Sequence, residues 1–137
     1  MPVSSLAAKL KLKAGQRAAL INAPDSYRTD LGRIPPGVTF SENLTGAFNW
    51  IQIFVKNRAE LRRFATRAVR ALGPGGILWI AFPKGTSSIR TDLTRDNGWE
   101  ALQRHKMKWV TLVSVNQTWS AFAMRAYKPG DERRSFR

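Results

Sequence analysis

Short apolar runs alternate with polar and amphipathic segments along most of the chain. Runs of about four to eight apolar residues between turn residues are typical of buried strands. The clearest of them are 17–22, 50–55 and 77–82. Two more runs, 109–115 and 120–127, are separated by four residues, which predicts a hairpin. A shorter strand is expected at 38–40, after the Pro35-Pro36-Gly37 turn.

The helix predicted between residues 57 and 72 has the strongest local signals. Asn57 and Glu60 have the spacing of a capping box. Apolar residues recur on one face, while arginines fall largely on the other. The apolar positions are Leu61, Phe64, Ala65, Ala68, Val69 and Leu72, and the arginines are Arg58, Arg62, Arg63, Arg67 and Arg70. Gly73 is expected as a left-handed C-terminal cap, followed by Pro74, which cannot continue a helix.

Two other helices are expected, a short one from about 26 to 31 and one from about 92 or 96 to 106. Gly98 weakens the second. Residues 1–14 are interpreted as a polar entry segment. The alternation of strands and helices predicts a single α/β domain, a three-layer sandwich with a mostly parallel sheet of about six strands and a C-terminal antiparallel hairpin.

We place the domain at residues 11–127, with an N-terminal extension at 1–10 and a charged flexible tail at 128–137. A chain of 137 residues with 43% hydrophobic content suits one domain with one core. The absence of cysteine excludes disulfides and thiolate metal sites, and a single histidine, His105, argues against a metal site. No signal peptide or spanning segment is recognisable, so a cytoplasmic protein without membrane contact is expected.

The chain is strongly basic, with 23 Lys and Arg residues against 9 acids and a formal charge of +14. Such a balance favours polyanions or an acidic partner, although composition bias alone can produce it. The arginines of the 57–72 helix could contact phosphates. Because the aromatics mostly occupy apolar strand positions, sequence-specific recognition is disfavoured, and nonspecific electrostatic binding to nucleic acid is left open as an alternative function.

The order of elements resembles the second half of class I S-adenosylmethionine-dependent methyltransferases. Leu72-Gly73-Pro74-Gly75-Gly76 is similar to the Leu-Lys-Pro-Gly-Gly turn that opens the fifth strand in that family. Residues 13–17 resemble the lead-in to its first strand, and the terminal hairpin resembles its last two strands. The resemblance spans about residues 10–127 and implies a Rossmann-like, methyltransferase-like fold.

The whole chain also resembles a family of small bacterial proteins of unknown function built on a reduced form of that scaffold. The matching segments are Asn22-Ala23-Pro24, Ile53-Phe54-Val55, Arg58-Ala59-Glu60-Leu61, Gly75 to Lys84, Thr91 to Thr94 and Thr118 to Ser120. This resemblance implies no established activity. The segment before Trp50 is short, which predicts that a strand or helix of the parent fold is missing.

In the methyltransferases the loop after the first strand is rich in glycine, so that the backbone can approach the cofactor. Residues 22–27 contain no glycine, and Pro24 removes a backbone donor. The resemblance places Glu42 where an acidic residue holds the ribose hydroxyls. We therefore expect a domain that lacks conventional methyl transfer and has no assigned cofactor, with S-adenosylmethionine-dependent methyl transfer through a divergent loop as the alternative.

Ligands of open parallel sheets bind beyond the carboxyl ends of the strands. Lys84, with the hydroxyls of Ser87 and Ser88, could hold a small anion there, or the segment is simply a polar loop. The candidate ligand-binding residues are Asn22, Pro24, Glu42, Lys84, Ser87, Ser88, Asp92 and Trp119.

Two of these candidates have simpler interpretations. Asp92 is expected to cap a helix in preference to acting as an acid, and Trp119 to pack as a lid in preference to binding a ligand. A triad of Ser87, His105 and Asp92 is not supported, because no nucleophile-elbow motif exists. The other tryptophans are expected in the core or over the sheet edge: Trp50, Trp79, Trp99 and Trp109.

Overall fold

The computed structural model describes residues 5–105 and 107–126. The predicted tail at 128–137 lies outside them. The elements in chain order are α1 (Leu6–Lys9), β1 (Arg17–Ile21), α2 (Tyr27–Leu31), β2 (Thr39–Ser41), β3 (Phe48–Phe54), α3 (Arg58–Ala71), β4 (Leu72–Pro83), α4 (Glu100–Gln103), β5 (Met107–Ser114) and β6 (Trp119–Ala126). Among the described residues, no helix has the length and apolar character needed to span a membrane.

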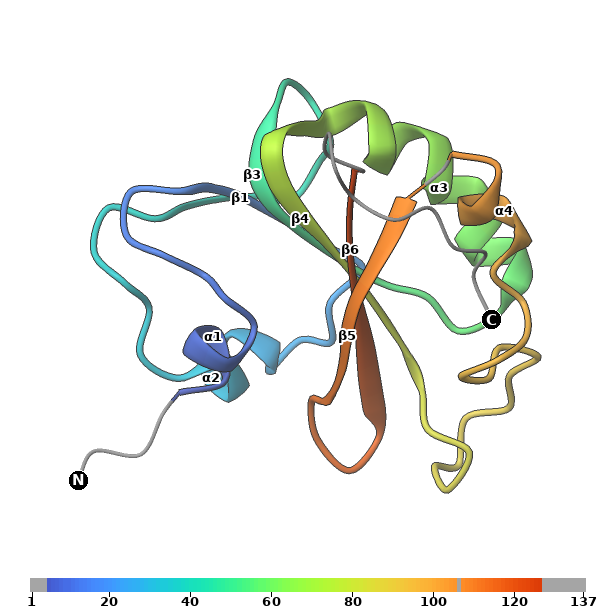
Figure 1. The fold of residues 1–137 in the computed structure, drawn as a ribbon. Coiled ribbons are helices and arrows are strands. Elements are labelled where there is room, and N and C mark those ends of the chain that lie inside the picture. The colour runs from blue at the N-terminus through green and yellow to red at the C-terminus, as the bar shows by residue number, and fades with distance from the viewer. Residues whose placement is uncertain (1–4, 106, 127–137) are drawn as a thin grey trace.

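The strands form one six-stranded sheet in the order β2-β1-β3-β4-β6-β5 (Figure 1). The first four strands in this order are parallel to one another, whereas β6 pairs antiparallel with both β4 and β5. The predicted α/β class, the mostly parallel sheet and the C-terminal hairpin are confirmed. Because β1, β3 and β4 are parallel, their carboxyl ends meet at one edge of the sheet.

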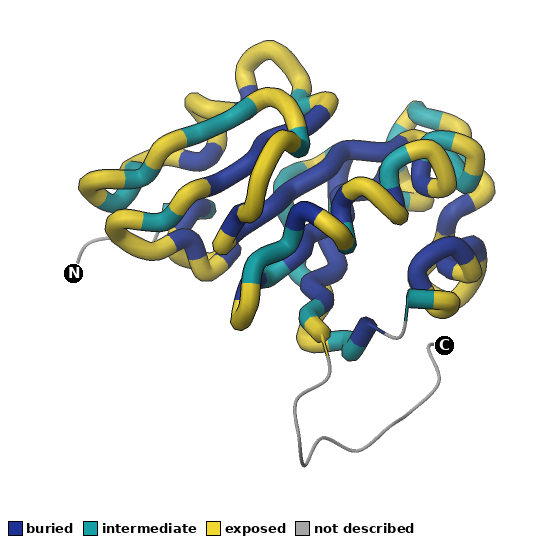
Figure 2. The backbone as a smooth tube through the Cα atoms, turned by 90° about the horizontal axis from the view of Figure 1, so that it is seen from above, coloured by how far each residue is buried: buried dark blue, intermediate teal, exposed yellow. Residues whose placement is uncertain are grey.

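Two apolar clusters cover the two faces of the sheet and make a three-layer structure. One cluster joins α3 and α4 to residues such as Ile51, Ile53 and Ile80. The other joins α1 and α2 to Trp50 and the alternate residues of the same strands. Figure 2 shows the central strands buried along most of their length. Burial on both faces explains the continuous apolar runs of the parallel strands.

The two ends of α3 follow different rules. At its start the predicted capping box forms, since Asn57 Oδ1 accepts from Glu60 N at 2.9 Å. At its end the predicted left-handed cap at Gly73 is wrong, because the chain becomes extended at Leu72 and enters β4 directly. The left-handed residue is Gly75, with a φ of 72°.

Gly76 is required by a close approach of the backbone. A Cβ there would lie 3.0 Å from both Phe48 O and Gly73 O, tighter than ordinary van der Waals contact, so the backbone would have to shift. The pairing of β3 with β4 shifts register between Phe48 and Trp50 at the same place. The glycines of this turn therefore serve backbone geometry at the amino end of β4.

The interpretation of residues 1–14 as a polar entry segment is wrong for the residues described. They form α1 and a following turn, and Ala7, Leu10 and Leu12 are buried. The carbonyl oxygen of Leu10 accepts two hydrogen bonds, from the indole N–H of Trp50 and from that of Trp79, each at 2.8 Å. Two strands of the sheet thus hold this segment against one face.

The long helix expected up to residue 106 is also largely wrong. Only α4 is helical, and residues 84–99 form an irregular loop. Gly98 has a φ of 105°, which interrupts a helix. The loop is nevertheless packed, because Leu93 and Trp99 are buried, and Trp99 lies 5.0 Å from Phe122, ring centre to ring centre. Tertiary contacts therefore override the capping signals of the sequence.

The outer strand β5 carries the two exposed large apolar side chains found among the described residues. Val110 is 41% exposed and Leu112 is 39% exposed. The pairing of β5 with β6 shifts register between Trp109 and Thr111, so that Val110 is an extra residue in the outer strand. This is the geometry of a β-bulge.

The shared carbonyl of Leu10 predicts a coupling between two tryptophans. In W50F or W79F the carbonyl keeps one donor, whereas in the double variant it is buried without either. The double variant should therefore lose about 1–3 kcal/mol more than the sum of the single losses. Urea unfolding of the four proteins measures this coupling. Strictly additive losses would contradict the role assigned to the carbonyl.

Candidate functional site

Two separate hollows lie at the edge where the parallel strands end, and they divide the candidate residues between them. The β4 pocket has a volume of about 730 Å³ and includes Lys84, Ser87 and Ser88. The β1–β2 pocket has a volume of about 400 Å³ and includes Asn22, Pro24 and Glu42. Asp92 and Trp119 line neither hollow. The sequence predicts that all these candidates gather at one edge of the sheet. The structure divides those that line a hollow between two distinct pockets at that edge.

The β4 pocket is rich in donors. Its three cationic side chains are those of Lys84, Arg90 and Arg95, and no carboxylate is among its lining residues. Its hydroxyl side chains are Thr86, Ser87, Ser88, Thr91, Thr94 and Ser120. Ammonium, guanidinium and hydroxyl groups all donate hydrogen bonds, so the lining favours an anion.

Lys84 follows β4 directly and is held in place by the hairpin. Its backbone N–H donates to Thr118 O at 2.8 Å, and its Nζ donates to Ser114 Oγ at 2.6 Å. An ammonium has three donors, so two remain for a ligand. A turn follows, in which Ser87 N donates to Lys84 O at 3.0 Å. The cation is therefore positioned by backbone and side-chain contacts at the mouth of the loop.

Asp92 caps a helix, as the sequence predicted. The helix that it caps is α3 and not one that follows it in the chain. Its Oδ1 accepts from the backbone N–H of Arg58 at 2.8 Å, and its backbone carbonyl accepts from Arg58 Nε at 3.1 Å. The two side chains also form an ion pair at 4.0 Å. Arg58 is the first residue of α3, so Asp92 fastens the irregular loop to the start of that helix.

The β1–β2 pocket is built around an unusual backbone conformation. Asn22, directly after β1, has a φ of 60°, the left-handed region that glycine adopts most easily and asparagine tolerates. Its Nδ2 donates to Phe54 O at 3.4 Å. The chain thus makes a tight turn after β1 without the expected glycine.

The charge of the β1–β2 pocket is opposite in character to that of the β4 pocket. Two carboxylates, Asp25 and Glu42, line it together with one guanidinium, Arg28. Arg28 lies over the ring of Phe40, 4.5 Å from its centre. A chain with nine acids in total therefore places two of them at one hollow.

A buried pair holds the loop after β1 against the sheet. Tyr27 Oη donates to Gln52 Oε1 at 2.7 Å, and both residues are fully buried. Burial raises the pKa of Tyr27 well above its usual value, which keeps the hydroxyl protonated as the donor to Gln52. No hydrogen-bond partner is found for Gln52 Nε2 in the described part of the chain. Tyr27 therefore stays neutral and fixes the start of α2.

The remaining candidates have structural roles. Trp119 is buried, and its ring packs edge-on against Phe54 at 5.0 Å between centres. His105 Nε2 lies 3.2 Å from Thr66 Oγ1 on α3, whereas Asp92 is bound to Arg58. The side chains of the rejected triad thus make other contacts. Within residues 5–105 and 107–126, no group of three or more His, Asp or Glu side chains could hold a metal ion.

Sequence reasoning did not find four charged residues that line the two pockets. Arg90 and Arg95 lie on either side of the Thr91 to Thr94 segment, and Asp25 and Arg28 flank the start of α2. A signal was present, since charged residues close to a strand end in an α/β fold lie near the ligand edge. Arg95 was expected inside a helix that begins at about residue 92, and so it was not predicted as part of a loop at this edge.

Comparison with known proteins supports the fold and nothing finer. No protein-family model and no curated protein match the chain. Among solved structures, a S-adenosylmethionine-dependent methyltransferase from Aquifex aeolicus has a TM-score of 0.58 at 10% identity, covering 85% of both chains. N-methyltransferase NodS from Bradyrhizobium japonicum, in complex with S-adenosylhomocysteine, has a TM-score of 0.56 at 13% identity, covering 90% of this chain and 84% of its own.

A TehB-like S-adenosylmethionine-dependent methyltransferase from Corynebacterium glutamicum has a TM-score of 0.56 at 12% identity, covering 90% of this chain and 88% of its own. The predicted resemblance to the class I methyltransferase scaffold is therefore confirmed at the level of the fold. At such identities the likeness concerns the fold alone.

The contact between Asp92 and α3 predicts a selective loss of stability. In D92A the first N–H of α3 loses its acceptor, so the free energy of unfolding should fall by about 1 kcal/mol. D96A removes the same charge from an exposed position in the same loop and should change it by less than about 0.5 kcal/mol. Urea unfolding compares the two, and equal losses would contradict the cap.

Proposed function

We propose that this methyltransferase-like domain binds a small anionic ligand in the β4 pocket and does not perform conventional methyl transfer. One observation carries the proposal: three cations and six hydroxyls surround a hollow of about 730 Å³ with no carboxylate among the lining residues. Pockets that bind small molecules typically have volumes of about 300–1,000 Å³.

The arrangement favours a compact, highly charged anion such as a phosphate or pyrophosphate group. Lys84 supplies a fixed point charge at the end of β4, while Arg90 and Arg95 can each form paired hydrogen bonds to neighbouring oxygens. The serine and threonine hydroxyls supply neutral donors, which add selectivity for an oxyanion over a halide. Apolar residues such as Ile89 and Leu112 leave room for an organic part of the ligand.

Titration with pyrophosphate tests this proposal at the pocket. We expect saturable binding in low-salt buffer, measured by calorimetry, and a loss of about tenfold or more in the R90Q/R95Q variant, since each charged hydrogen bond contributes about 1.5–3 kcal/mol. K84M should weaken binding similarly. Inorganic phosphate, the smaller probe, should bind more weakly than pyrophosphate.

The control must separate the pocket from the general positive charge of the chain. K13Q/R33Q removes the same charge from exposed positions that do not line the pocket, and it should leave pyrophosphate affinity within about twofold. Equal losses in the two double variants, or no saturation at about 10 mM pyrophosphate, would overturn the proposal.

A second candidate function is S-adenosylmethionine-dependent methyl transfer, and the left-handed conformation of Asn22 favours it. That conformation supplies the turn after β1 for which a glycine was expected. The cofactor carries a sulfonium, an ammonium and a carboxylate, charges that the carboxylates of Asp25 and Glu42 and the guanidinium of Arg28 can complement. Glu42 would hold the ribose hydroxyls, and the bound cofactor would supply an activated methyl group.

Calorimetry with S-adenosylmethionine and S-adenosylhomocysteine tests this candidate separately, because it concerns the β1–β2 pocket. A Kd below about 1 mM, raised about tenfold in E42Q and unchanged in a D96N control, is the expected result for this function. Absence of binding, or binding that E42Q leaves unchanged, would rule it out without affecting the pyrophosphate result.

A further inference from the structure

Helix α3 presents a row of arginines to solvent on the side opposite the core. Leu61, Ala65 and Ala68 are buried against the sheet. The exposed side of the helix carries what we call the α3 arginine surface, which consists of Arg62, Arg63, Arg67 and Arg70. At 1.5 Å per residue, these four positions extend over about 12 Å of the helix axis.

The acidic groups nearest the start of this helix are already bound elsewhere. Glu60 Oε1 accepts from the backbone N–H of Lys56 at 2.7 Å. The carboxylate of Asp92 accepts a hydrogen bond from the backbone N–H of Arg58 and forms an ion pair with the Arg58 side chain at 4.0 Å. For the residues that the structure describes, no ion pair involves a member of the α3 arginine surface. Among the described residues, then, no carboxylate is paired with this positive charge.

We propose that the α3 arginine surface docks on the phosphate backbone of a double-stranded nucleic acid. Each strand of a duplex carries one phosphate per about 3.4 Å of axis, so about 12 Å of helix spans roughly three or four phosphates of one strand. Arginine forms paired hydrogen bonds with phosphate oxygens and loses less hydration than lysine in doing so. The β4 pocket is a separate site, and this docking does not depend on it.

Two features favour a duplex backbone over a single strand or a lipid surface. The aromatic residue of α3, Phe64, packs against the core and has the guanidinium of Arg67 5.1 Å from its ring centre, so it offers no free ring for base stacking. The exposed apolar side chains Val110 and Leu112 lie on β5 and not on α3. The arginine surface thus lacks the apolar face with which amphipathic helices enter membranes.

Fluorescence anisotropy with a labelled mixed-sequence duplex of about 20 base pairs tests the docking at several salt concentrations. The variant is R62Q/R63Q/R70Q, which spares Arg67 because of its contact with Phe64 and uses glutamine to preserve helix propensity. We expect affinity at about 50 mM salt to fall at least tenfold and the salt slope to decrease by about 2.7, since each lost phosphate contact removes about 0.9.

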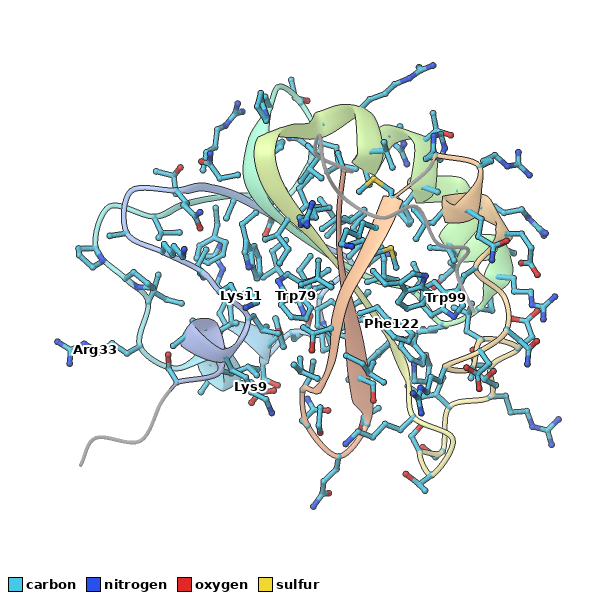
Figure 3. All side chains as sticks on the ribbon, in the orientation of Figure 1. Lys9, Lys11, Arg33, Trp79, Trp99 and Phe122 are labelled. Atoms are coloured by element: carbon cyan, nitrogen blue, oxygen red, sulfur yellow. The ribbon has the colours of Figure 1, made fainter. Side chains whose placement is uncertain are left out.

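The matched control is K11Q/K13Q/R33Q, which removes the same charge from exposed positions. Figure 3 labels Lys11 and Arg33 on the α1–α2 side of the molecule, away from α3. The control should keep the wild-type slope to within about one unit. Circular dichroism and thermal melting verify that both triple variants are folded.

Four results would overturn the proposal. The first is an absence of duplex binding at about 50 mM salt, and the second is an equal effect of the two triple variants. The third is tighter binding of a single strand of the same length. The fourth is binding to phosphatidylserine vesicles that depends on these arginines while duplex binding does not. Equal effects would mean general charge attraction, and the vesicle result would mean a lipid surface.

Discussion

The backbone carbonyl of Leu10 ties the first residues of the chain to the middle of the sheet. Its two indole donors belong to Trp50 and Trp79, which lie 40 and 69 residues further along the chain. A buried carbonyl without a donor is costly, so the turn after α1 must lie where both tryptophans reach it. This contact joins the turn after α1 to Trp50 on β3 and to Trp79 on β4, which Figure 3 labels, and residues 10 to 79 must come together before it can form. Folding should therefore depend on long-range contacts that are slow to assemble.

The parts of the fold that the sequence predicted are those governed by local rules. The apolar runs identify β1, β3 and β4 because these strands are buried, and the spacing of two runs identifies the β5–β6 hairpin. The Asn57 cap begins α3 as its spacing indicates. The errors arise where a local signal has a distant partner. Lysines alternate with apolar residues around Leu10, so nothing nearby reveals its indole partners. Asp92 has the type of a cap, but the helix that it caps lies 34 residues earlier in the chain.

The same distinction applies to the candidate sites. Sequence order placed Asn22, Glu42 and Lys84 at the carboxyl edge of the parallel strands, and the structure has them after β1, β2 and β4. It could not separate Asn22 and Glu42 from Lys84, since the division depends on which strands lie side by side. The charges differ as well: carboxylates at the β1–β2 pocket and only cations at the β4 pocket. The two pockets of this basic chain are thus lined by side chains of different charge, which the net charge alone conceals.

The bulge in β5 affects how readily copies of the protein can associate through the edge of the sheet. An outer strand with free backbone groups can add a strand from another molecule and begin aggregation. Here the register shift beside Val110 interrupts the regular edge that such an addition would need. At the other edge β2 has three residues, which offers little to pair with. Both borders of the sheet are therefore poor templates for growth, and repulsion between chains of charge +14 adds to this protection.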